Sequence, residues 1–168
     1  EELTSGRVQR AAAMARKYMP GKPSDAFSNA ADSFHDAMAD YGQDIRGDFT
    51  KSGRLEDIPS SLEAPIRKVL EAAKAIIALI AIDEEIVDSD TIAERARVKG
   101  AVNEIATTCG KLLKQSNNQV LWYEPTFSTL YLAPLSVSEV LRSNLLTKTP
   151  VIATSATLTV GNSFDAMA

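Results

Sequence analysis

Hydrophobic positions recur at helical spacing through the first 115 residues of the chain. Four segments, at about 3–19, 24–46, 60–87 and 90–115, each carry one apolar stripe and an otherwise polar surface. Such stripes, repeating every three to four residues, are typical of amphipathic helices that bury one face. Four of them joined by polar connections predict a mainly α fold, an antiparallel helical bundle.

The second segment has the most regular stripe. Its apolar residues alternate in steps of four and three, which predicts lengthwise packing against a neighbouring helix; they are Phe27, Ala31, Phe34, Met38, Tyr41 and Ile45. The stripe expected for the third segment comprises Leu62, Ile66, Val69, Leu70, Ala73, Ile76, Ile77 and Ile80. For the fourth segment we expect Ile92, Ala96, Val102, Ile105, Cys109 and Leu112 to face inward.

The pattern changes after residue 118. The runs "VLWYE" (120–124) and "STLYLAPL" (128–135) have strand composition, with Pro125 marking a turn between them. "SVSE" (136–139) is a capping box that predicts a short helix to about Leu146. "TPVIATSATL" (149–158) then indicates a buried strand. The sequence therefore predicts a bundle over 1–118 followed, over 119–168, by a small strand–helix–strand piece of an α/β fold.

Composition excludes several classes of protein. The 168 residues carry a net charge of −4, which does not suit a module built chiefly to bind phosphate backbones. One cysteine, Cys109, excludes an internal disulfide and fits a small buried residue. No stretch approaches the ~20 apolar residues of a membrane span, so we expect a cytoplasmic protein without membrane contact. The chain begins with Glu1 rather than Met, and we expect it to be a piece of a longer protein.

Other polar and aromatic residues have two interpretations each. His35 lies one position off the apolar stripe, which favours a boundary residue over a ligand or catalyst. The acid-rich segment 82–90 offers groups for Mg²⁺ or for acid–base chemistry, but its place at a helix end favours a solvated turn. Trp122 and Tyr123 are candidates for stacking on nucleic-acid bases, worth ~1–3 kcal/mol each, whereas aromatic residues in a strand more often belong to the core.

The last strand carries two hydroxyls that stand out as candidate site residues. In an extended segment residues i and i+2 point the same way, so Ser155 and Thr157 present their hydroxyls side by side. Open α/β sheets bind ligands at the carboxyl ends of their strands. Because no Ser-His-Asp grouping is evident, nucleophilic catalysis is not predicted. Contact with groups around a bound phosphate is the chemistry that these hydroxyls suit.

These residues carry a resemblance to a known family. Thr154-Ser155-Ala156-Thr157-Leu158 resembles motif III of superfamily-two helicases, and the preceding "WYE" and "LAPLSVSEVL" are similar to the DinG/XPD-like branch. In that branch a helical insertion, the arch domain, lies between the DEAH box and motif III. The resemblance implies that 1–118 is an arch-like domain and that 119–168 belongs to the first RecA-like domain.

The resemblance implies an ATP-dependent DNA helicase that translocates 5′ to 3′ on single-stranded or forked DNA and uses ATP with Mg²⁺. Ser155 and Thr157 would couple ATP hydrolysis to DNA movement through hydrogen bonds worth ~1 kcal/mol each. The sequence has no P-loop GxxxxGK[ST], DEAH box or motif VI. We therefore expect the 168 residues alone to be inactive. The family's iron–sulfur cluster needs four cysteines upstream of the DEAH box, so its presence in the parent stays open.

The main alternative is a standalone helical interaction or scaffolding domain in which the Ser-Ala-Thr run is accidental. A P-loop and a DEAH box upstream in the parent reading frame would discriminate between the two hypotheses. We also expect the apolar strand at 151–153, if separated from a central sheet, to be buried in the bundle, to become disordered, or to pair with another chain in a non-native self-association.

Overall fold

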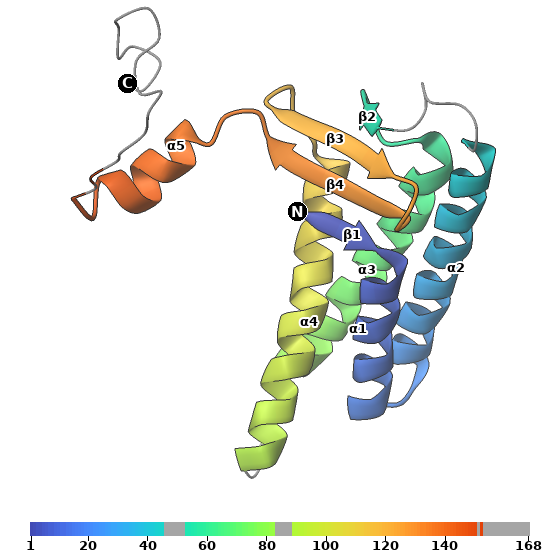
Figure 1. Ribbon diagram of the computed structural model, residues 1–168. Coiled ribbons are helices and arrows are strands. Elements are labelled where there is room, and N and C mark those ends of the chain that lie inside the picture. Colours follow the sequence, from blue (N-terminus) through green and yellow to red (C-terminus); the bar gives the residue numbers. More distant parts are fainter. Residues whose placement is uncertain (46–52, 83–88, 151, 153–168) are drawn as a thin grey trace, which may run out of the picture. The chain divides into compact units, whose positions relative to one another are not determined.

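A computed structural model of the chain describes residues 1–45, 53–82, 89–150 and 152. The chain forms two compact units, Glu1–Leu135 and Ser136–Ala168. The first unit contains four long helices and a four-stranded sheet (Figure 1). Its elements in chain order are β1 (Glu2–Thr4), α1 (Ser5–Tyr18), α2 (Lys22–Asp44), β2 (Gly53–Leu55), α3 (Ser60–Ile82), α4 (Ser89–Leu113), β3 (Gln119–Glu124) and β4 (Thr129–Pro134).

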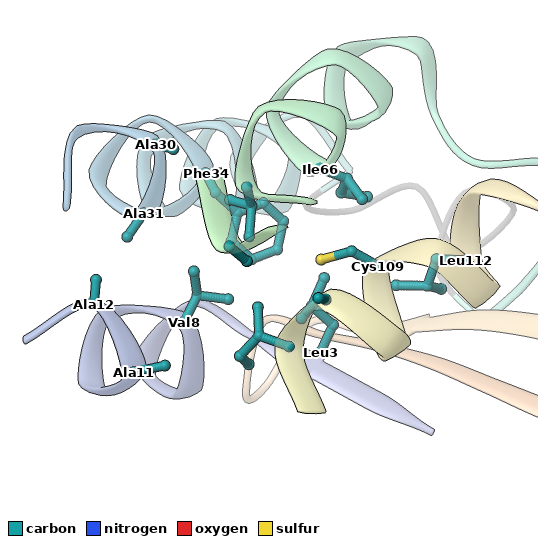
Figure 2. Packing of buried hydrophobic residues seen from close by; sticks show 14 of the residues in the cluster. Leu3, Val8, Ala11, Ala12, Ala30, Ala31, Phe34, Ile66, Cys109 and Leu112 are labelled. Atoms are coloured by element: carbon teal, nitrogen blue, oxygen red, sulfur yellow. The ribbon is translucent and has the colours of Figure 1, made fainter. Parts of the chain in front are cut away.

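The four helices form the predicted antiparallel bundle. Contacts join α1 to α2, α2 to α3, α3 to α4, and α4 back to α1, so the helices surround one core. Figure 2 shows side chains from all four helices meeting there, including Val8, Phe34, Ile66 and Cys109. Burying a side chain of Val, Leu, Ile or Phe contributes about 1.5–3 kcal/mol, so these stripes supply most of the drive to fold.

The stripe predicted for α2 is confirmed. Phe27, Ala31, Phe34, Met38 and Ile45 are buried, and Tyr41 is half-buried against the same core. The stripe of α3 is confirmed as well, with Leu62, Ile66, Val69, Ala73, Ile76 and Ile80 buried and with Leu70 and Ile77 packed at its margin.

The stripe predicted for α4 is correct only over its C-terminal half. Val102, Ile105, Cys109 and Leu112 are buried, but Ile92 is 58% exposed and Ala96 is exposed, while Val98 is buried. At 1.5 Å per residue, the 25 residues of α4 span about 37 Å against about 21 Å for the 14 residues of α1. The N-terminal part of α4 extends past its partner (Figure 1), so apolar residues there are not covered.

The chain begins with a strand that sequence patterns did not reveal. A helix was predicted from about Leu3, but residues 2–4 are extended and α1 starts at Ser5. Thr4 is the N-cap of α1, and its side-chain oxygen accepts a hydrogen bond from the Arg7 N–H at 3.1 Å. Leu3 is fully buried at the edge of the core. A three-residue strand is too short to produce an alternating pattern that sequence analysis can detect.

The sheet has the order β1-β4-β3-β2, and every neighbouring pair is antiparallel. The predicted strands at 120–124 and 128–135 form the central hairpin, β3 and β4. β1 pairs with β4 at one edge, and β2, which lies in the segment expected to be a loop, pairs with β3 at the other. Leu121, Tyr123, Leu130 and Leu132 pack into the bundle core, so the hairpin belongs to the same unit as the helices.

The second unit contains the predicted short helix. It comprises α5 (Ser138–Leu141), which continues as one π-helical turn, η1 (Arg142–Leu146). Ser136 caps its start, since the Ser138 N–H donates to the Ser136 hydroxyl at 3.3 Å. The sequence placed the boundary between the two parts at 118/119, whereas the compact units divide at 135/136. The buried face of the hairpin is the physical reason for the later division.

Candidate functional site

The motif-like residues lie outside the part of the chain that the structure describes. Ser155 and Thr157, with Thr154, Ala156 and Leu158, all fall within 153–168. Of the buried strand expected at 149–158, the structure describes Thr149, Pro150 and Ile152, and these three are exposed and not in a strand; Ile152 is 93% exposed. The expectation is therefore wrong for these three residues, and the remaining residues of the strand lie outside the described part. Most of the acid-rich segment also falls outside the described residues. The coupling role of the two hydroxyls therefore stays a prediction.

The two adjacent aromatic candidates lie on opposite faces of the sheet. Tyr123 is 1% exposed and projects into the bundle. Its hydroxyl donates a long hydrogen bond of 3.5 Å to the Met38 carbonyl, and its ring meets Tyr41 edge-on with centroids 5.0 Å apart. Burial, with the Tyr123 ring alongside, raises the pKa of the Tyr41 hydroxyl. Tyr123 is thus a core residue, and its ring has no face open to a nucleic-acid base.

Trp122 lies on the opposite, outward face. It is half-buried and stacks on Tyr131 of β4, with ring centroids 4.9 Å apart and an interplanar angle of 13°. Both residues occupy one row across all four strands, since Tyr131 is the register partner of Glu2 and Trp122 is the partner of Arg54. Aromatic cross-strand pairs of this kind stabilise a sheet by about 0.2–1 kcal/mol.

A neighbouring row widens the apolar part of this surface. Val120 and Ala133 are register partners on the same face and are both half-buried. We define the outer sheet face as this four-residue apolar centre with Glu2 and Arg54 at its rim; the centre is Val120, Trp122, Tyr131 and Ala133. A hollow of about 320 Å³ lies beside it, lined by Glu1, Glu2, Arg7, Trp122, Tyr131, Leu132 and Ala133.

Charged residues at the β1 edge are held in ion pairs. The Arg7 guanidinium donates to the Glu2 carboxylate at 3.2 Å and also pairs closely with Glu104 of α4. Lys111 of α4 pairs with the Glu1 carboxylate, and this hydrogen bond is the main reason that the pKa of Glu1 lies below its usual value. Partly exposed pairs contribute about 0–1 kcal/mol each. They position β1 against α4 and leave little free positive charge at this edge.

A second hollow, of about 630 Å³, lies between β2 and the connection from α4 to β3. Gln115 lies at its wall and donates to the Glu56 carbonyl and the Asp57 carboxylate, both at 3.0 Å. The Gln115 Oε1 is buried, and no partner for it is found in the described part of the chain. The wall is polar; the Ser116 hydroxyl at this wall lies 3.5 Å from Gln119 Oε1, and the Asp57 carboxylate accepts from Gln115.

Other candidate groups have structural roles. Cys109 is fully buried, as predicted, and burial raises the pKa of its thiol to about 12, which keeps it protonated. His35 is at the surface, with its Nδ1 3.1 Å from the Ser5 hydroxyl. Among the described residues, no group of three or more His, Cys, Asp or Glu side chains could hold a metal ion. None of the helices described here combines the length and apolar character needed to cross a membrane.

Sequence analysis missed Tyr131 and Arg54 as partners of Trp122. The alternation Leu130-Tyr131-Leu132, with its outer members buried, is a period-two signal that places Tyr131 on the outward face. Arg54 had no comparable signal, because β2 is three residues long and its pairing with β3 is a tertiary contact.

Comparison with known proteins gives one local similarity. Proteins named ATP-dependent helicase DinG from Mycobacterium tuberculosis (strain H37Rv) and Mycobacterium bovis are each 38% identical to this chain over 82 residues. The match covers 41% of the chain and 12% of each relative, so the chain spans a small part of their length. No family model matches the chain, and no solved structure matches it significantly. The similarity indicates a relationship to DinG-like helicases for part of the chain.

Proposed function

We propose that this chain is part of an ATP-dependent DNA helicase of the DinG/XPD-like type. The observation that carries the proposal is the similarity of part of the chain to the mycobacterial DinG helicases. The Ser-Ala-Thr run at 155–157 and its approach through "LAPLSVSEVL" support the same assignment. In this proposal residues 1–135 form the arch-like insertion, the chain returns to the first RecA-like domain from 136 onward, and 154–158 are motif III.

The topology of the first unit suits an insertion. β1 pairs with β4 through the register Glu2–Tyr131, Leu3–Leu130 and Thr4–Thr129. The Leu132 N–H also donates to the Glu1 carbonyl at 2.9 Å. The two ends of this unit are therefore adjacent strands. A domain with adjacent ends can be inserted into a host without separating the host strands on either side. This geometry supports an arch-like insertion in which the hairpin β3–β4 makes the return to the host.

The proposed activity divides between this chain and the rest of the parent. These 168 residues contain no P-loop GxxxxGK[ST], DEAH box or motif VI, which in the proposed parent would supply the phosphate site of phosphoryl transfer. When bound to the parent, ATP and Mg²⁺ would supply the reactive phosphoryl group. The chain's own contribution is positional: Ser155 and Thr157 exchange hydrogen bonds as the nucleotide state changes, which moves DNA through the parent. Single-stranded or forked DNA is the proposed substrate.

The test uses the parent protein with Ser155→Ala and Thr157→Ala combined. We expect DNA unwinding to fall more than DNA-stimulated ATP hydrolysis, because each lost hydroxyl weakens coupling by ~1 kcal/mol without removing the phosphate site. Strand displacement and phosphate release are measured on the same preparation. Thr149→Ala, a hydroxyl deletion upstream of the motif, is the matched control and should leave both rates unchanged.

Two results would contradict the proposal. Equal loss of unwinding and ATP hydrolysis in a folded double variant would remove the coupling role. Clear ATP turnover by the 168-residue chain alone would show that its chemistry does not depend on the missing motifs.

A further inference from the structure

The outer sheet face has the composition of a protein–protein interface. Its centre of Val120, Trp122, Tyr131 and Ala133 is apolar, and charged residues lie around it. Trp, Tyr and Arg are the residues most enriched at the energetic centres of interfaces, where a polar rim surrounds a desolvated apolar patch. The opposite face of the same sheet is already covered by the bundle, so this face is the one available for a partner.

The charges on this face argue against a nucleic-acid strand as its occupant. Arg54 is the register partner of Trp122, and Arg7, which lines the hollow beside the aromatic pair, is already paired with Glu2 and Glu104. Glu124 lies on the same face of β3, two residues from Trp122. Binding to a phosphate backbone relies on a surplus of Lys and Arg that releases counterions. The balance of charge here suits a protein surface of mixed polarity.

The position of this face relative to the unit's ends indicates where the partner comes from. β1 and β4 are the strands through which the proposed insertion joins its host. β1 is an edge strand of the sheet, and β4, which carries Tyr131, lies next to it. The hollow beside the aromatic pair is lined by Glu1 and Glu2 from the start of the unit and by Leu132 and Ala133 from its end. In the proposed parent, polypeptide that precedes Glu1 therefore starts next to this face.

We propose that the outer sheet face is the surface through which the first unit docks onto a part of the parent helicase that lies outside these 168 residues. This inference rests on the proposed function, because it needs a parent into which the unit is inserted. The docked surface presents aliphatic or aromatic side chains to the Trp122–Tyr131 pair, an acceptor to the Trp122 indole N–H, and a carboxylate or carbonyl to Arg54.

The first experiment is hydroxyl-radical footprinting of the 168-residue chain and of the intact parent, read by mass spectrometry. We expect oxidation of Trp122 and Tyr131 to be several-fold slower in the parent without DNA. Tyr18, a half-buried tyrosine at the C-terminal end of α1, is the matched control and should react equally in both. Tyr123 should be protected in both, because the bundle covers it.

The second experiment separates docking from a stabilising role inside the unit. Trp122→Thr with Tyr131→Thr keeps residues of high strand propensity and removes the aromatic rings. We expect a larger fall in Tm for the parent than for the 168-residue chain. Equal falls in both would mean that the rings act only within the unit, and the proposal would then fail.

Other footprinting outcomes also overturn the proposal. Protection that appears in the parent only on addition of an oligothymidylate would identify single-stranded DNA as the occupant. Protection in the 168-residue chain that rises with concentration would identify a second copy. Equal oxidation of Trp122 and Tyr131 in the 168-residue chain and in the parent would mean that no part of the parent outside these 168 residues covers the face. Helicase activity of the parent is assayed separately, so an inactive parent with protected rings would overturn the proposed function and leave the interface standing.

Discussion

At the residue scale, Gly42 near the end of α2 is required by its contact with Tyr123. A Cβ added at Gly42 would lie 2.8 Å from the Tyr123 hydroxyl and 3.9 Å from the ring carbon that bears it. Tyr123 cannot easily yield, because its ring is buried and packed against Tyr41. The glycine therefore allows the sheet to approach the C-terminal turn of α2, and it links two elements 81 positions apart in the chain.

We expect Gly42→Ala to destabilise the protein by about 1–3 kcal/mol through overpacking, although alanine has the higher helix propensity. The free energy of unfolding, measured by urea denaturation, tests this. Adding Tyr123→Phe should recover most of the loss, because it removes the clashing oxygen. Gly100→Ala in α4 is the control, since no atom lies within 4 Å of a Cβ there, and it should stabilise by up to about 1 kcal/mol. A stabilising Gly42→Ala would contradict the packing at this contact.

At the element scale, the helix formed by α5 and η1 has an apolar face without a partner among the described residues. Val137, Leu141 and Leu145 follow each other at steps of four, and they are 55%, 45% and 41% exposed. Leu146 is 54% exposed beside them. Contiguous apolar patches of this kind mark surfaces that another polypeptide covers. In the proposed helicase that cover comes from the rest of the RecA-like domain.

We expect the 168-residue chain by itself to self-associate through this helix. Leu141→Lys with Leu145→Lys should shift the association to higher protein concentration, because burying two lysines in the contact is unfavourable. Sedimentation velocity over a concentration series measures the effect. Asn144→Lys with Thr149→Lys adds the same charge at exposed polar positions and is the matched control. If both pairs of substitutions act equally, net charge rather than the apolar face governs association.

At the scale of the whole molecule, the first unit has its own core and closes its sheet with its own ends. Leu3 from β1 packs against the cluster to which all four helices contribute, as Figure 2 shows for Cys109 and Leu112. Ion pairs from Glu1 and Arg7 to α4 hold the same edge. This organisation is the one expected of an independently folding unit, and the strand β1 is an integral part of it.

We therefore expect a chain of residues 1–135 to unfold cooperatively with the Tm of the 168-residue chain. Removal of residues 1–4 should cost about 2–5 kcal/mol, because it deletes the buried Leu3 side chain along with the pairing to β4. Thermal unfolding followed by circular dichroism compares the three chains. A marked loss of stability in residues 1–135 would show that the second unit contributes to the core of the first.

Sequence patterns determined the helices and the central hairpin. Helical periodicity in 24–46 and 60–87 identified the buried faces of α2 and α3, because a bundle helix must hide one stripe along its length. Strand composition on both sides of Pro125 identified β3 and β4. The Ser-Ala-Thr run and its approach pointed to the DinG/XPD-like helicases, and the local similarity to mycobacterial DinG agrees with a relationship to them.

Tertiary structure decided the features that depend on partners distant in the chain. β1 and β2 are three-residue strands that exist through their pairing with the hairpin, and local sequence has no period long enough to reveal them. The exposure of Ile92 follows from the difference in length between α4 and α1, which periodicity within α4 does not contain. The opposite roles of Trp122 and Tyr123 were set when the hairpin placed one face on the bundle. Composition says that both are aromatic, but only packing determines which ring is core and which is surface.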